Sequence, residues 1–282
     1  MAVVVVTDSS SCPDSELAQR YGIHVVPLHV LVGDRTFREG VDDLPDDYND
    51  GTSSTSAASS GELDDCYRTA LAASDGDGVV AVHLSRQLSG TWQVGSQVAE
   101  PFDEQVRVVD SRAAGMGSGF CALAAARAAQ AGASIDDVYN AAVDTAGHAR
   151  CFVVVDRLDH LRRGGRISTA TALLGTALAM KPLLHIVDGK LVLKEKTRTT
   201  SKAIAKLIDA AVKEAGAGPA AIAVQHLDAP ERADEVAAKL RDRLPHLTEL
   251  VICELGAVLG VHVGSGAVAV LVVRGGAGQV EP

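Results

Sequence analysis

Short apolar segments alternate with helical patterns in the first half of this chain, and this alternation restricts the possible folds most strongly. The segments are Ala2–Val6, Val79–His83 and Gln105–Val109. Their length and their valine content are typical of buried strands. Strands that are separated by helices can pair in parallel, because each helix carries the chain back to the start of the sheet. We therefore predict an α/β fold with a parallel sheet in this half.

Helical segments are predicted around these strands. The pattern Ser11-x-x-Asp14 is a capping box, and it begins a helix that runs to about Tyr21. Another helix opens at Glu62, with Ser59 as its N-cap. The remaining helices are predicted to begin at about Thr91 and to cover Gly119–Ala131 and Ile135–Ala149.

One long stretch in this half has no periodic pattern. His24–Val32 is predicted to be a single strand. Residues 33–60, which follow it, are rich in Asp, Gly, Ser and Thr. A segment of this length is too long for an ordinary connection, so we predict a functional loop.

The second half has a different pattern, which begins with a strand at Cys151–Val155. Asp188-Gly189 lies between the β-like segments His185–Val187 and Lys190–Leu193, and such a pair is typical of a hairpin turn. We therefore predict antiparallel pairing in this half. The other predicted elements are strands at Ala220–Gln225, Glu249–Leu255 and Ala267–Val273, and a helix over Glu231–Leu244.

The length of 282 residues exceeds the common domain size of roughly 100–150 residues. We predict an N-terminal α/β domain over 1–150 with a parallel sheet, and a C-terminal α/β domain over 151–282 with a mixed or antiparallel sheet. The glycine-rich end from Gly275 is predicted to be frayed.

Composition excludes several classes of protein. The 26 basic and 36 acidic residues give a net charge of −10, which disfavours binding to nucleic acids or to anionic membranes. No apolar run approaches the roughly 20 residues that span a bilayer, and the N-terminus lacks the pattern of a secretory signal. The five cysteines are far apart and contain no C-x-x-C pair, so we expect reduced thiols in a cytoplasmic protein.

Small hydroxyl and glycine residues gather in several separate stretches. Because three of these stretches can cap helices, we expect their hydroxyls and backbone N–H groups to converge on an anionic ligand. The stretches are Thr7-Asp8-Ser9-Ser10-Ser11, Thr55-Ser56-Ala57-Ala58-Ser59-Ser60-Gly61-Glu62, Ser85-Arg86-Gln87-Leu88-Ser89-Gly90-Thr91, Gly164-Gly165-Arg166-Ile167-Ser168 and His262-Val263-Gly264-Ser265-Gly266.

Each candidate also has a purely structural interpretation. Ser89 can be a simple N-cap, Arg166 a surface arginine beyond a helix that stops at Gly164, and His262 a core histidine. Asp8 follows a strand as in some phosphatases, but Ser10 stands where those enzymes need a second aspartate. No residue pattern in the sequence indicates a metal site.

In their order along the chain, the motifs resemble those of the DegV family of bacterial fatty-acid-binding proteins. The resemblance covers nearly the whole chain. The motifs that carry it are Thr7-Asp8-Ser9, Thr55-Ser56, Leu88-Ser89-Gly90-Thr91, Leu161-Arg162-Arg163-Gly164-Gly165-Arg166-Ile167-Ser168, Lys181-Pro182 and His262-Val263-Gly264.

The resemblance implies two α/β domains that enclose a long-chain fatty acid such as palmitate in a tunnel, and no permanently bound cofactor. Some family members are acyl-carrying subunits of a fatty acid kinase. In those members a separate ATP-binding subunit, which brings ATP and Mg²⁺, phosphorylates the bound carboxylate. The protein itself is then a carrier and not an enzyme.

The resemblance also implies roles for individual residues. Thr55 and Ser89 bind the carboxylate, together with Ser56, Gly90 and Thr91. Arg166 and His262 assist phosphoryl transfer. Further residues of the pocket or its rim are Asp8, Ser9, Ser111, Gly115 and Arg198.

The sequence departs from the family pattern at two places. Ala57-Ala58 stands where Gln-Pro is usual after Thr-Ser, so Thr52 offers a competing register for the carboxylate ligand. The number of residues between the threonine and the motif Ser59-x-x-Glu62 favours Thr55 as the carboxylate ligand. Gly115 stands where the family usually carries a serine.

Two other functions use the same residues. One is a stand-alone acyl hydrolase or acyltransferase with Ser89 as nucleophile and His262 as base. The other is a protein that binds a small polar anion in a short polar pocket. A hydrogen bond between Ser89 and His262 would favour the first, and the absence of an apolar tunnel would favour the second.

Overall fold

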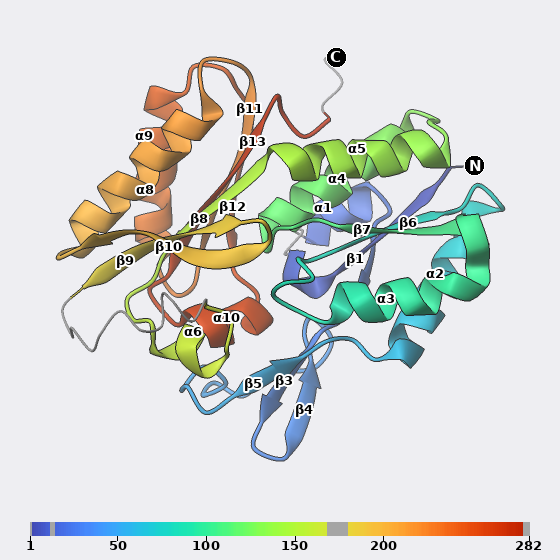
Figure 1. Ribbon diagram of the computed structural model, residues 1–282, viewed down its shortest axis with the longest axis horizontal. Helices are drawn as coiled ribbons and strands as arrows, with labels where there is room; N and C mark the ends of the chain where they lie inside the picture. The colour runs from blue at the N-terminus through green and yellow to red at the C-terminus, as the bar shows by residue number, and fades with distance from the viewer. Residues whose placement is uncertain (1, 12–14, 168–179, 279–282) are drawn as a thin grey trace.

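A parallel sheet forms the first half of the protein, as predicted. The computed structural model describes residues 2–11, 15–167 and 180–278 (Figure 1). All strand pairs of this sheet are parallel. Its strands lie in the order β2 (His24–Val26), β1 (Val4–Asp8), β6 (Val79–His83) and β7 (Val106–Asp110).

Helices cover both faces of this sheet, because its central strands are apolar on both sides. In β6, Val79 and Ala81 pack toward α2 (Ser60–Ser74), whereas Val80 and Val82 pack toward α4 (Met116–Gln130). The predicted N-cap Ser59 is confirmed, and its side chain forms a capping box with Glu62 at the start of α2. The other helices of this half are η1 (Ser9–Ser11), α1 (Ser15–Arg20), α3 (Thr91–Ala99), η2 (Glu100–Gln105) and α5 (Ile135–His148).

A mixed sheet forms most of the second half. Its strand pairs are antiparallel except β11 with β12, and Asp188-Gly189 connects β9 to β10 as a hairpin. The predicted antiparallel pairing and hairpin are therefore confirmed. The strand order is β10 (Lys190–Thr197), β9 (Lys181–Val187), β8 (Ala149–Val154), β13 (Val268–Arg274), β11 (Ala220–His226) and β12 (Leu247–Glu254).

The helices of the second half include two that were not predicted. Helix α8 (Thr200–Ala215) packs on the mixed sheet beside α9 (Pro230–Arg243), through an apolar stripe that contains Ile204, Leu207 and Ile208. This spacing is a helical signal, which our sequence analysis overlooked. The other helices of the described part of this half are α6 (Asp159–Arg163) and the unpredicted α10 (Ala257–Val263).

The prediction of a single strand over His24–Val32 is wrong. Pro27 has no N–H group to donate to a strand partner, and the chain leaves the parallel sheet there. It re-enters as β3 (His29–Val32) in a separate antiparallel sheet with β4 (Arg35–Arg38) and β5 (Ser54–Ser56). The predicted functional loop at 33–60 thus contains two strands.

Helix α4 lies between the two large sheets (Figure 1). It packs on β1 and β6 of the parallel sheet and on β8 and β13 of the mixed sheet, so one apolar cluster contains residues from both halves. The chain changes from one sheet to the other between β7 and β8. The division into domains at residue 150 stays a prediction.

The end of the described chain is packed and not frayed, contrary to the prediction. Ala277 is fully buried, and its carbonyl oxygen accepts a hydrogen bond from Arg127 at 2.7 Å. Arg127 also forms an ion pair with Glu249 at 2.9 Å, which links α4 to β12.

Three further expectations concern cysteines, the first helix and membrane spans. Cys66, Cys121 and Cys151 are free thiols, in agreement with the expectation of reduced cysteines. Of the five cysteines, Cys12 lies outside the described residues, and so does Asp14 of the predicted capping box. Within the described ranges, the chain forms no helix of the length and apolar character needed to cross a membrane.

We predict that the buried contact between Tyr67 and His83 stabilises the first half. The Tyr67 hydroxyl lies 2.8 Å from Nε2 of His83, and both side chains are buried. Tyr67→Phe leaves a buried polar atom unpaired and should lower the free energy of unfolding by about 1–3 kcal/mol. Urea denaturation measures this change. Tyr139→Phe, at a half-buried tyrosine, is the matched control, and an equal effect of the two variants would contradict the prediction.

Candidate functional site

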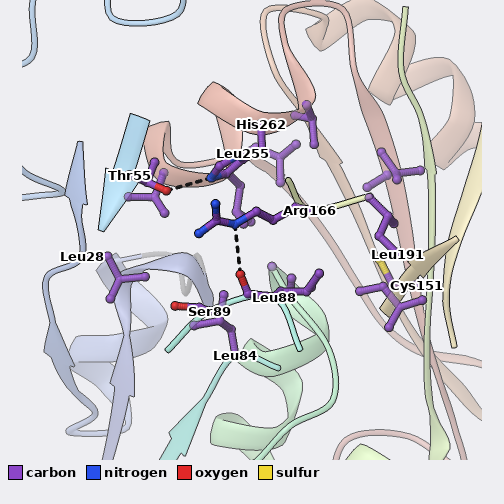
Figure 2. A pocket seen from close by; sticks show the side chains of 18 of the residues that line it. Leu28, Thr55, Leu84, Leu88, Ser89, Cys151, Arg166, Leu191, Leu255 and His262 are labelled. Atoms are coloured by element: carbon purple, nitrogen blue, oxygen red, sulfur yellow. Dashed lines mark hydrogen bonds between the residues drawn. The ribbon is translucent and has the colours of Figure 1, made fainter. Parts of the chain in front are cut away.

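An apolar cavity opens at the carboxyl ends of the parallel strands, which is where α/β sheets commonly bind ligands. About 930 Å³ of space free of protein atoms, partly open to solvent, lies between these strand ends and the mixed sheet. Aliphatic side chains from both halves form most of its wall (Figure 2). They are Leu28, Leu84, Leu88, Val153, Leu161, Ile186, Leu191, Leu255, Val258, Leu259, Val263 and Leu271.

Thr55 and His262 meet at one end of this cavity. Thr55 lies in β5 and His262 in α10, and a hydrogen bond of 2.8 Å joins Thr55 Oγ1 to His262 Nε2. Burial, and next the nearby charges of Arg166 and His160, lower the pKa of His262 to about 4. The imidazole is therefore neutral at neutral pH. Its other nitrogen, Nδ1, is buried and has no hydrogen-bond partner among the residues that the structure describes.

Arg166 reaches into the space between the Thr55–His262 pair and Ser89 (Figure 2). The turn after α6 directs it there, because Gly165 adopts a φ of +66° and the Arg166 N–H donates to the carbonyl of Leu161 at 3.2 Å. Its Nε donates to the carbonyl of Leu88 at 3.2 Å. Arg166 is half-buried and lines the cavity, so the interpretation as a plain surface arginine is wrong.

Ser89 lies in a turn between β6 and α3. Its hydroxyl is 2.9 Å from the Thr91 hydroxyl and accepts from the Thr91 N–H at 3.3 Å. The N-cap of α3 is Gly90, which provides no side-chain cap, so the interpretation of Ser89 as the N-cap is also wrong. Ser89, Gly90 and Ser56 line the cavity, whereas Thr91 is buried behind Ser89 and does not.

Asp8, Ser9 and Ser111 lie outside the lining and stabilise the loops behind it. The Asp8 carboxylate accepts from the Leu84 N–H at 3.0 Å, and the Ser9 hydroxyl accepts from the Leu28 N–H at 3.0 Å. The Ser111 hydroxyl pairs with that of Ser118 at 2.8 Å. Two of these contacts therefore fix backbone segments whose leucines do line the cavity.

Gly115 lines the cavity at the start of α4, with a φ of +60°. A Cβ atom at this position would collide with Oε1 of Gln225, which accepts from the Met116 N–H at 2.8 Å. A serine in this place would therefore displace Gln225. Arg198 is exposed after β10 and is absent from the lining as far as the chain is described, so its position does not support a role at the rim.

The competing residue Thr52 has a different environment. Its N–H and its hydroxyl both donate to Oδ1 of Asp50 at 2.7 Å, and Thr52 does not line the apolar cavity. The geometry therefore favours Thr55 as the hydroxyl that faces this cavity. Ser168, the last residue of the Gly-Gly-Arg stretch, lies outside the described residues.

Glu39, which was not predicted from the sequence, holds α10 in position. Its Oε1 accepts from the Val258 N–H at 2.8 Å, near the start of α10. Burial raises the pKa of this carboxyl group. No sequence signal indicated the contact, because it joins residues 219 positions apart. In the described chain, no group of three or more His, Cys, Asp or Glu side chains could hold a metal ion.

Comparison with known proteins identifies the family. A family model described as an uncharacterised protein of the DegV family matches residues 2–275. A DegV domain-containing protein of Mycobacterium tuberculosis is 49% identical over 272 residues, which cover 96% of this chain and 97% of the relative.

Solved structures agree with this match. A Thermus thermophilus protein described by "Fatty Acid Binding of a DegV family Protein" has a TM-score of 0.90 and 28% identity, covering 97% of this chain and 100% of that one. The Bacillus subtilis protein described as "DegV, a fatty acid binding protein" has a TM-score of 0.86 and 31% identity, covering 97% and 99%. The chain studied here belongs to the DegV family.

Proposed function

We propose that this protein binds a long-chain fatty acid, with the tail in the apolar cavity and the carboxylate at Thr55, Ser89 and Arg166. The observation that carries this proposal is an aliphatic cavity, partly open to solvent, that ends in a cluster of hydrogen-bond donors. The DegV proteins of Thermus thermophilus and Bacillus subtilis, whose folds superpose on this one, are described as fatty acid binding.

The two parts of such a ligand would contribute differently. Burial of the tail supplies most of the affinity, at about 0.8 kcal/mol for each CH₂ group. The hydroxyls of Thr55 and Ser89 and the guanidinium of Arg166 orient the carboxylate. Charge-assisted hydrogen bonds from Arg166 also offset the cost of removing the carboxylate from water.

We further propose that the protein presents this carboxylate to a separate ATP-binding kinase subunit. A carboxylate oxygen would form a bond to the γ-phosphorus of ATP while the bond to the ADP oxygen breaks. Negative charge on the transferring group would be stabilised by Arg166. ATP and Mg²⁺ would come with the kinase subunit.

The geometry gives less support to a stand-alone hydrolase. The Ser89 hydroxyl pairs with Thr91, and Nε2 of His262 pairs with Thr55. A serine nucleophile needs a histidine base, and that base is normally oriented by an acceptor on its other nitrogen. Nδ1 of His262 has no partner in the described structure. The aliphatic wall of the cavity likewise argues against a small polar anion as the ligand.

We predict that the protein purified from a bacterial host retains a long-chain fatty acid. Filling an apolar cavity with an acyl chain is favourable, because it removes the apolar surface of both from water. Organic extraction followed by mass spectrometry identifies the lipid and its chain length. A lipid-free extract combined with no binding of added palmitate would refute the proposal.

Ser89→Ala and Thr55→Ala should each weaken fatty acid binding by about 1–3 kcal/mol, because each removes one of the donors to a charged acceptor. Titration with a fluorescent fatty acid measures the change. Thr52→Ala is the matched control, since it removes the same hydroxyl three residues from Thr55. A weakened Thr52→Ala protein beside an unchanged Thr55→Ala protein would assign the carboxylate to Thr52 instead.

Arg166→Ala should reduce acyl phosphate formation more than it reduces fatty acid affinity. With a cognate kinase subunit and ATP, formation should fall by about 10²–10³-fold, because the arginine stabilises charge that develops in transfer. Affinity should fall by no more than about 10-fold. His262→Ala should behave similarly. The wild-type protein can also be tested alone for hydrolysis of acyl esters. Hydrolysis that is lost in both Ser89→Ala and His262→Ala would contradict the carrier function and indicate a hydrolase.

A further inference from the structure

One amide side chain, that of Gln225, lies in the part of the apolar cavity wall that the mixed sheet forms. Figure 2 shows Cys151, another residue of this sheet wall, across the cavity from Thr55. Gln225 lies opposite Ala269 in the sheet, and Ala269 lies opposite Val153, so the three side chains share one face. Among the described residues, the sheet wall consists of Cys151, Val153, Ile186, Leu191, Gln225, Ala269 and Leu271. Apart from one thiol, the neighbours of Gln225 in this wall are therefore aliphatic.

The carboxamide of Gln225 is fully buried and held in one orientation. Its Oε1 accepts from the Met116 N–H at 2.8 Å, and because an N–H can only donate, this contact identifies the oxygen of the amide. Gly115, which also lines the cavity, lies against the carboxamide. A Cβ atom at Gly115 would be 3.3 Å from Cδ and 3.7 Å from Nε2 of Gln225. Glycine has no side chain, so none from this position separates the carboxamide from the cavity.

The contact with α4 uses only part of the hydrogen-bonding capacity of this amide. Nε2 carries two hydrogens, and Oε1 has two lone pairs. In the part of the chain that the structure describes, Nε2 donates once, to the Sγ of Cys253 at 3.5 Å, and sulfur is a weak acceptor. One N–H and one lone pair remain. Burial of such groups without a partner is unfavourable, and a plain hydrocarbon tail offers them none.

We propose that Gln225 binds a hydroxyl group on the acyl chain, so that the preferred ligand is a hydroxylated long-chain fatty acid. This inference rests on the proposed function and specifies the acyl chain. A hydroxyl can accept from Nε2 and donate to Oε1, whereas an oxo group can only accept. Gln225 belongs to β11, whereas Thr55 and His262 belong to β5 and α10. The amide therefore recognises the tail and not the carboxylate.

The proposal predicts that the wild-type protein selects the position of the hydroxyl. Delipidated full-length protein is titrated calorimetrically with stearate and with hydroxystearates that carry the hydroxyl at different carbons. One isomer should bind about 10-fold or more tightly than the others, because a misplaced hydroxyl meets the aliphatic wall and stays unpaired. Equal affinities of all isomers would overturn the inference. Tighter binding of the corresponding oxostearate would overturn the hydroxyl as the preferred group.

Gln225→Met tests the residue itself. It should weaken binding of the preferred hydroxystearate about 10-fold or more and change stearate binding less than about 2-fold. Leu271→Met is the matched control, because it reshapes the same sheet wall without removing a polar group, and it should change both affinities by the same factor. Comparison of two ligands on one variant cancels any loss of folded protein.

Two results separate this inference from the proposed function. An equal effect of Gln225→Met on hydroxystearate and stearate would show that Gln225 only supports α4, and fatty acid binding would stand. Failure of the wild-type protein to bind stearate and every hydroxystearate would instead overturn the proposed function. If Gln225→Met does not fold, the selection among isomers by the wild-type protein still decides the inference.

Discussion

Helix α4 fixes the distance between the two large sheets, and the cavity depends on that distance. The helix is buried along most of its length and consists largely of Ala and Gly. A Cβ atom at Gly117 would lie 2.8 Å from the Cβ of Ala113, and one at Gly119 would lie 2.7 Å from the carbonyl oxygen of Ser11. Larger side chains at these two positions would force α4 away from the segments that contain Ala113 and Ser11, because packed interiors have no room for extra atoms. The apolar cavity lies where this helix begins, at Gly115.

Polar groups near the strand ends are of two kinds. Some are paired within the protein and stabilise loops, and others have no partner among the described residues. Asp8 is fully buried, but the Leu84 N–H, His83 and Ser10 satisfy its oxygens. This carboxylate stabilises the loops behind the cavity and does not line it. Among the described residues, Nδ1 of His262 and the hydroxyl of Ser53 are buried without partners. Unpaired buried polar groups are unfavourable for folding alone.

Sequence patterns predicted the parallel sheet, the hairpin at Asp188-Gly189 and Ser59 as an N-cap, and all three are confirmed. They failed where one residue or one long-range contact decides the outcome. Pro27 ends β2 and divides the predicted strand between two sheets. The short helix α10 starts under Glu39, whose carboxylate comes from the other half of the chain. The glycine-rich end is ordered as far as it is described, since Ala277 packs beside α4 and accepts a hydrogen bond from Arg127.

The sequence by itself therefore determined the features that depend on near neighbours in the chain: strand and helix type, the caps, and the turn in which Asp188 and Gly189 adopt φ values of +49° and +77°. It also named Thr55 and His262 as candidates through their motifs. Only the tertiary structure decided that these residues touch across 207 positions, that Arg166 lies between them and Ser89, and that Asp8 stays behind the site. The reason is physical. Local patterns depend on interactions within a few residues, whereas a cavity is formed by the packing of sheets that no local pattern specifies.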